Sequence, residues 1–86
     1  MGFMEQKDFQ LSILSPERVL FKGNVTSVTM PGEMGEFTVL LNHASLISSL
    51  RKGVIEYTDE KGKQNLNITG GFVDVNKNVV SVCVEQ

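Results

Sequence analysis

The chain has 86 residues with eight basic and ten acidic side chains, which gives a net charge of −2. This length provides one domain with a small core, and the lack of any lysine or arginine run argues against a nucleic-acid partner. One cysteine and one histidine supply neither an internal disulfide nor a zinc ligand set, and no apolar run approaches the roughly 20 residues of a membrane-spanning helix. We therefore expect no cofactor, no nucleic acid and no direct membrane insertion.

The composition favours strands, because eleven Val, four Ile and five Thr stand against a single Ala. The first strand is predicted at Phe9 to Ile13, where apolar and polar residues alternate, and the turn Ser15-Pro16-Glu17 ends it. An extended run follows from Val19 to Lys22. Gly23-Asn24 then indicates a break or bulge before the next strand, from Val25 to Met30.

The second half continues this pattern. Leu46 to Leu50 reads as a short apolar strand, and Val54 to Thr58 leads into a charged hairpin tip at Asp59 to Lys63. The return strand is expected from Gln64 to Thr69. Gly70-Gly71 then removes two side chains within a β pattern, which predicts a bulge or a close backbone approach.

The inward positions change parity across this glycine pair, because Leu66 and Ile68 are even whereas Val73 and Val75 are odd. A last turn precedes a valine-rich strand that holds Val80, Val82 and Val84. Together these elements predict an all-β fold, a small two-sheet β-sandwich of roughly eight to ten short strands. We expect a single domain over residues 1–86, with residues 1–7 as a disordered start or a cloning remnant.

The most patterned stretch runs from Met30 to Leu46. Pro31-Gly32-Glu33-Met34-Gly35 closes a strand, and its two glycines predict a loop that needs positive φ angles or a tight approach. An ordinary surface loop is the simpler interpretation. A phosphate cradle is disfavoured, because Glu36-Phe37 opens a strand instead of the helix and Lys-Ser/Thr pair of a P-loop.

Two side chains have a chemical alternative to a plain surface role. His43 lacks a nucleophile elbow nearby, so we interpret it as a loop histidine that hydrogen-bonds the backbone, with a partner contact as the alternative. Lys61, at the charged hairpin tip, could be the modified lysine of a lipoyl- or biotinyl-carrier domain. Glu60 and Gly62 flank it in place of the Met or Ala that is common beside the lysine of such carriers, so a solvated turn is favoured.

Several motifs in their order and spacing resemble the N-terminal β-sandwich domain of the epsilon subunit of F-type ATP synthase. The resemblance covers nearly the whole chain from about residue 8. The motifs that carry it are Leu11-Ser12-Ile13-Leu14-Ser15-Pro16-Glu17, Phe21-x-Gly23, Pro31-Gly32-x-x-Gly35-Glu36-Phe37, Val39-Leu40-x-x-His43-Ala44-x-Leu46 and Gly70-Gly71-Phe72-Val73-Asp74-Val75.

The resemblance implies a non-catalytic rotor subunit of the proton-translocating complex, which couples the gamma subunit of the central stalk to the membrane-embedded c-ring. It further implies a peripheral place at the cytoplasmic face of the bacterial inner membrane. Carried over by motif, Gly35 and Glu36 fall in a ring-facing loop and His43 falls in the neighbouring one. The same motifs assign structural roles to Pro31, Gly32, Phe37, Gly70 and Gly71.

In the family, gamma would pack on a sheet face and edge, which periodicity alone does not identify. Apolar residues beside inward neighbours would leave an exposed patch that a permanent partner explains, and we expect Ile47, Leu50, Val79 and Val80 among them.

The chain departs from the family pattern at three places. Thr38 replaces a glycine, Leu41-Asn42 replaces Pro-Gly before the histidine, and Ser45 replaces a proline, so we expect a looser loop around His43. The family commonly continues into a helical arm after the sandwich, and without it we expect no arm-mediated inhibition of ATP hydrolysis. The alternatives to the rotor role are the carrier domain and a generic β-sandwich interaction module.

Overall fold

The computed structural model describes residues 7–86, which form nine β-strands and no helix. The all-β prediction and the predicted number of strands are confirmed. Residues 1–6, which carry most of the predicted disordered start or cloning remnant, lie outside the described range. The strands are β1 (Phe9–Leu14), β2 (Val19–Val25), β3 (Ser27–Gly32), β4 (Gly35–Val39), β5 (Leu46–Leu50), β6 (Gly53–Asp59), β7 (Gly62–Ile68), β8 (Gly70–Asn76) and β9 (Val79–Glu85).

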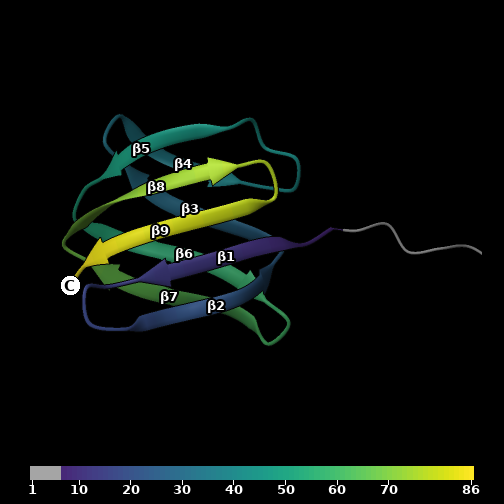
Figure 1. Cartoon of the computed structure of the whole chain (residues 1–86), viewed down its shortest axis with the longest axis horizontal. Helices are drawn as coiled ribbons and strands as arrows, with labels where there is room; N and C mark the ends of the chain where they lie inside the picture. Colours follow the sequence, from purple (N-terminus) through teal and green to yellow (C-terminus); the bar gives the residue numbers. More distant parts are fainter. Residues whose placement is uncertain (1–6) are drawn as a thin grey trace, which may run out of the picture.

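The strands pair in the order β2-β1-β9-β8-β5-β3-β6-β7, with β4 joined to the other side of β3. The sheet folds over between β5 and β3, so one layer holds β2, β1, β9, β8 and β5 and the other holds β4, β3, β6 and β7 (Figure 1). Neighbouring strands are antiparallel except β1 and β9, which are parallel. The predicted two-sheet sandwich is confirmed. Within residues 7–86, no helix is long and apolar enough to span a membrane.

Two contacts hold the layers together on opposite sides. On one side, Gly32 of β3 pairs with Leu50 of β5, which makes the two layers one continuous ladder. On the other side, the ring centroids of Phe21 from β2 and Tyr57 from β6 lie 4.4 Å apart with the planes tilted by 42°. Tilted aromatic pairs at this separation are favourable. The sandwich is therefore closed by hydrogen bonds on one side and by side-chain packing on the other.

A core of fifteen buried hydrophobic side chains fills the space between the layers. They occupy alternate strand positions, because successive side chains of a strand point to opposite faces. Among residues 7–86 no polar or charged side chain is buried. The core consists of Phe9, Leu11, Ile13, Val25, Val28, Met30, Val39, Leu50, Ile55, Ile68, Val73, Val75, Val80, Val82 and Val84.

The break predicted at Gly23-Asn24 is wrong. Both residues lie inside β2 and pair with Leu11 and Gln10 of β1. A Cβ at Gly23 would lie 3.2 Å from the ring of Phe21, so the glycine makes room for a ring of its own strand. The chain changes layers at Thr26 instead, where its N–H donates to the carbonyl of Thr58 at 2.9 Å.

The close backbone approach predicted at Gly70-Gly71 is present, and it requires a glycine at position 71. Gly71 has φ +153°, and a Cβ on it would overlap the carbonyl oxygen of Cys83 on β9. Gly70 has more room, since the nearest atom to its Cβ position is 3.8 Å away. At this point the chain passes from β7 in one layer to β8 in the other, which explains the predicted change of parity.

We expect Gly71→Ala to lower the free energy of unfolding by more than about 2 kcal/mol, because the new methyl group must displace the β9 backbone. Gly70→Ala is the matched control and should cost less than about 1 kcal/mol. Urea unfolding followed by circular dichroism measures both. Equal losses for the two variants would contradict the assigned overlap with Cys83.

Stability should also depend on the ionisation of Tyr57. Burial, and secondly the charge of Asp59, raise the pKa of Tyr57 above its ordinary value of 10.0. The folded state then holds the phenol proton more tightly than the unfolded state does. The contribution of Tyr57 to the unfolding free energy is therefore fully present below pH 10.0 and is lost as the pH rises through the raised pKa. We expect the unfolding free energy to fall more steeply above that pH for the native chain than for Tyr57→Phe. Parallel pH profiles would show that Tyr57 titrates alike in both states.

Candidate functional site

The predicted Pro31–Gly35 loop is a tight hairpin turn. Gly32 pairs with Gly35, so only Glu33 and Met34 lie outside the ladder. Gly35 has φ +133° in open space, which favours glycine for conformational reasons alone. Gly32 is needed for a different reason, because a Cβ there would lie 2.8 Å from the ring of Phe37.

This hairpin turn is fixed to the neighbouring strand β5. The N–H of Glu33 donates to the carbonyl of Ser49 at 3.0 Å, and the N–H of Arg51 donates to the carbonyl of Pro31 at 2.9 Å. The pairing of Gly32 with Leu50 lies on the same side, so the base of the turn is held against the end of β5. Its tip therefore projects from a backbone that has little freedom to move.

Of the ring-facing residues expected from the sequence, Glu36 is exposed at the start of β4, opposite Pro31. His43 is half-buried in the loop between β4 and β5. The ring Nδ1 of His43 lies 2.6 Å from the carbonyl oxygen of Ala44, and its backbone N–H donates to the carbonyl of Leu40 at 3.2 Å. This is the backbone-bonded loop histidine that the sequence predicts.

The loop around His43 is tied down by an asparagine pair that the sequence reading missed. Asn42 has φ +64°, a left-handed conformation that asparagine tolerates better than most residues. Its N–H donates to Oδ1 of Asn78 at 2.7 Å, and Nδ2 of Asn78 donates to Oδ1 of Asn42 at 3.1 Å. These bonds join the loop to the β8–β9 turn, so the loop is anchored where we expected it to be loose.

The hairpin turn and the His43 loop lie at opposite ends of β4, as Figure 1 shows. Four residue steps along a strand span about 13 Å, so Glu36 and His43 do not form one cluster. They are aligned along one side of the molecule instead. Among the strands of residues 7–86, β4 pairs only with β3, so this side is a free strand edge between two fixed loops.

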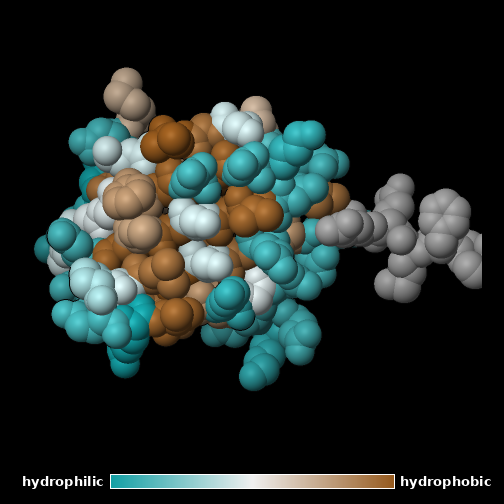
Figure 2. All heavy atoms as spheres, in the orientation of Figure 1, coloured by the Kyte–Doolittle hydropathy of each residue, from teal (hydrophilic) through white to brown (hydrophobic). Residues whose placement is uncertain are grey.

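A second surface is the outer face of the layer that contains β5, β8, β9 and β1. Its exposed or half-buried apolar residues, Leu14, Ile47, Phe72, Val79 and Cys83, are termed the apolar face. Serines lie among them, and Figure 2 shows brown and white spheres across the centre of this face, with a few teal ones among them and more around it. Two residues expected in the exposed patch, Leu50 and Val80, are buried in the core, because they occupy inward strand positions.

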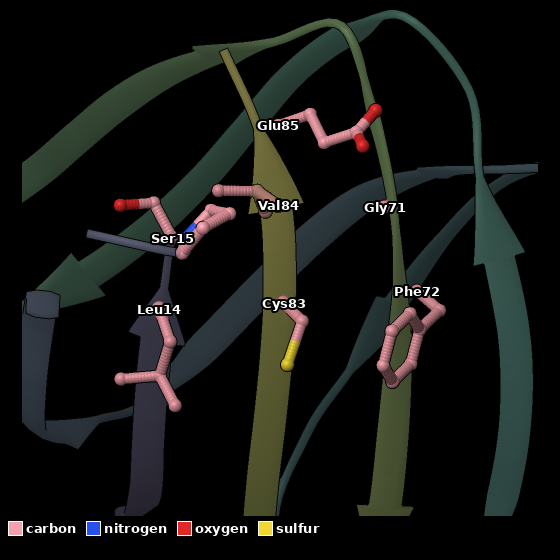
Figure 3. A pocket seen from close by; sticks show the side chains of 8 residues that line it. Leu14, Ser15, Gly71, Phe72, Cys83, Val84 and Glu85 are labelled. Carbon is pink, nitrogen blue, oxygen red and sulfur yellow. The ribbon is translucent and has the colours of Figure 1, made fainter. Parts of the chain in front are cut away.

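The apolar face carries a groove of about 580 Å³ at one end. Leu14 of β1 and Phe72 of β8 both pair with Cys83 of β9, so the three side chains form one row across the sheet. Figure 3 shows the sulfur of Cys83 between the other two side chains. The turn with Pro16 closes the groove at its end. The groove thus forms an open and mainly apolar surface to which a partner could bind.

The opposite layer has a different outer surface. Glu36 and Thr38 on β4, Thr29 on β3 and Glu56 on β6 lie at its outward positions, and Thr29 and Thr38 share a hydroxyl hydrogen bond of 2.8 Å. Val54, 45% exposed, is an apolar residue of this surface, which is termed the polar face. The two outer faces of the sandwich therefore differ in chemistry.

Lys61 lies at the tip of the β6–β7 hairpin, where its N–H donates to Oδ1 of Asp59 at 2.8 Å. Its side chain is exposed beside those of Glu60 and Lys63, as in the solvated charged turn that the sequence favours. Within residues 7–86, no group of three or more His, Cys, Asp or Glu side chains is placed to hold a metal ion.

Comparisons with known proteins cover nearly the whole chain. The family model for the β-sandwich domain of the ATP synthase delta/epsilon chain matches residues 8–86. The ATP synthase epsilon chain of Leptospira borgpetersenii serovar Hardjo-bovis is 40% identical over 76 residues, 88% of this chain and 60% of that protein. The epsilon chain of Nitratiruptor sp. is 48% identical over 77 residues, with the same two coverages. The chain thus spans 60% of the length of these relatives.

Solved structures contain the same fold. A chain in the Euglena gracilis mitochondrial ATP synthase, solved with OSCP, F1 and the c-ring, superposes with a TM-score of 0.86 at 25% identity, over 100% of this chain and 56% of that chain. A chain in the central stalk and c-ring structure of the Tetrahymena thermophila mitochondrial ATP synthase gives a TM-score of 0.75 at 15% identity, over 98% and 67%. The second likeness concerns the fold alone.

The asparagine pair gives a test of loop anchoring. Asn42→Gly keeps the left-handed backbone and its N–H bond to Asn78, so we expect a loss of about 1 kcal/mol or less in unfolding free energy. Asn42→Ala adds the strain of a Cβ in that conformation, for a total loss of about 2 kcal/mol. Urea unfolding measures the difference, and hydrogen exchange at residue 42 reports whether the N–H bond survives. An alanine variant as stable as the glycine variant would contradict the anchoring.

Proposed function

The chain belongs to the family of ATP synthase delta/epsilon chains through their β-sandwich domain, and from this premise we propose that it is a central-stalk subunit that couples gamma to the c-ring. The observation that carries this proposal is the apolar face. One outer surface of the sandwich exposes Ile47 by 77%, Phe72 by 53% and Val79 by 50%, although the fold itself does not require them there.

We assign the apolar face as the binding surface for gamma. Protein partners that stay together for the life of a complex bury apolar surface, and an exposed patch on a small domain is a sign of such a partner. Asp74 and Glu85 are acidic side chains within or beside this face, whereas the residues that define it are apolar. Apart from the strand β4 at its edge, the outer face of the opposite layer stays in water.

The side along β4 is the one we assign to the ring. It presents the hairpin turn with Gly35 and Glu36 at one end and His43 at the other, on loops that hydrogen bonds hold in place. A line of contact suits a subunit that must transmit rotation, because fixed points of contact that lie apart resist tilting. Polar loops of this kind complement a polar partner at the rim of an interface.

The same proposal makes the chain non-catalytic and peripheral. Nδ1 of His43 contacts a backbone carbonyl instead of a nucleophile or a carboxylate, which supports a structural role for the one histidine. The bacterial relatives support a place at the cytoplasmic face of the inner membrane, as part of the ATP synthase. ATP synthesis would then take place in other subunits, and this domain would carry torque.

We expect Ile47→Asp to weaken binding of purified gamma by about tenfold to a hundredfold, because it places a charge in a desolvated interface. Val54→Asp is the matched control: the same change on an exposed strand position of the polar face should leave the affinity unchanged. Isothermal titration calorimetry with the host's own gamma subunit measures both.

Cys83, the sole cysteine, supplies an independent footprint of the same face. Its alkylation by a maleimide should slow at least tenfold when gamma is bound, because its sulfur lies in the groove of the apolar face. No binding of gamma by the folded native chain would overturn the rotor assignment. Binding with undiminished labelling of Cys83 would move gamma to another face.

A further inference from the structure

One side chain has no explanation in the fold. Met34, at the tip of the β3–β4 hairpin turn, is 99% exposed, whereas the other exposed large hydrophobic residues of the described chain lie between 45% and 77%. A side chain this exposed contributes almost nothing to the core. Turn tips usually hold Gly, Pro, Asn, Asp or Ser, so turn formation does not call for a methionine either.

The other two-residue hairpin turns of the molecule make the contrast clear. The β6–β7 turn holds Glu60 and Lys61, and the β8–β9 turn holds Lys77 and Asn78. Both are polar, as solvent exposure favours. The turn with Met34 alone, among these three, presents an apolar side chain to solvent.

Met34 is also presented from a rigid base. Glu33, its neighbour, donates its N–H to the carbonyl of Ser49, and Nη1 of Arg51 lies 3.5 Å from the carbonyl oxygen of Glu33. Below the tip, the ring of Phe37 packs against Gly32. Binding through such a turn loses little backbone entropy, which is what a preorganised contact requires.

The surroundings of Met34 define the chemistry of its partner. Glu33 and Glu36 are exposed on either side of it, so an apolar tip is bordered by two carboxylates. A complementary surface has a small apolar notch with cationic or amide donors at its rim. The flexible, polarisable thioether fills notches of irregular shape better than a branched side chain does.

We propose that Met34 is the anchor residue of the ring contact, inserted into an apolar notch between polar groups on the membrane-sector ring. This inference rests on the proposed function and deepens it, because it names the side chain at the centre of the ring contact. In protein interfaces a few buried residues near the centre account for most of the binding energy, and the polar residues around them exclude water. Glu33 and Glu36 take that second role.

The test uses the full ATP synthase rotor of the host. Detergent-purified c-ring is titrated with a preformed complex of gamma and the chain, which carries the native residue, Met34→Ala, Met34→Leu or Val54→Ala. We expect Met34→Ala to weaken ring binding about tenfold, Met34→Leu to stay within about threefold of the native affinity, and Val54→Ala to match it. All three variants should bind gamma as the native chain does, because none of these positions lies on the apolar face.

The outcomes separate the anchor from the rotor assignment. If Met34→Ala binds the ring as tightly as the native chain while gamma binding is intact, the anchor is wrong and the rotor role stands. If Met34→Leu binds as weakly as Met34→Ala, the contact does not depend on apolar volume and the notch is wrong. If the native complex binds the ring no better than gamma alone does, the ring contact itself is overturned. Each variant changes an exposed side chain, so all are expected to fold.

Discussion

The pairing of Gly32 with Leu50 joins the two layers of the sandwich into one continuous sheet. At this point β3 passes from its partner β6 to β5, and the ladder turns from one layer into the other. The junction also fixes the base of the hairpin turn, because Pro31 and Glu33 bond to the chain on either side of Leu50. Only a glycine fits there, since the ring of Phe37 occupies the space of a side chain. The closed core and the rigid tip with Met34 therefore depend on the same contact.

Much of this fold can be predicted from the sequence, because alternation of apolar and polar residues is a local property. The valines of β8 and β9 and the parity change at Gly71 follow from it directly. Gly23 shows the limit of local reasoning. A glycine within a β pattern can mark a break or can make room for a neighbouring side chain, here the ring of Phe21. The register of β2 with β1, which runs unbroken through Gly23 and is not a local property, shows that Gly23 marks no break. Thr26 carries no local signal of the layer change, since its partner, Thr58, lies far away in sequence.

The candidate site also has features that the sequence predicts and features that depend on strand pairing. Gly35, Glu36 and His43 are predicted from motifs, whereas their arrangement along β4 depends on which strands pair. Asn78 was missed because its role lies in a bond to Asn42, 36 residues earlier. The only signal was Asn42 itself, because asparagine is one of the few residues that tolerate the left-handed conformation that it adopts here. The apolar face was foreseen in part, but Leu50 and Val80 could be placed inside only after the register was known.

The apolar face has a consequence for the life of the chain before assembly. Under the proposed function, a newly made copy that has not met gamma presents this surface to the cell, with Ile47 and Phe72 uncovered. Chaperones and proteases act on chains with exposed apolar surface, and a partner that covers it withdraws the chain from them. The amount of this subunit would then follow the supply of its partner instead of its own rate of synthesis. The exposed apolar surface would in this way help to keep the amounts of the two subunits matched.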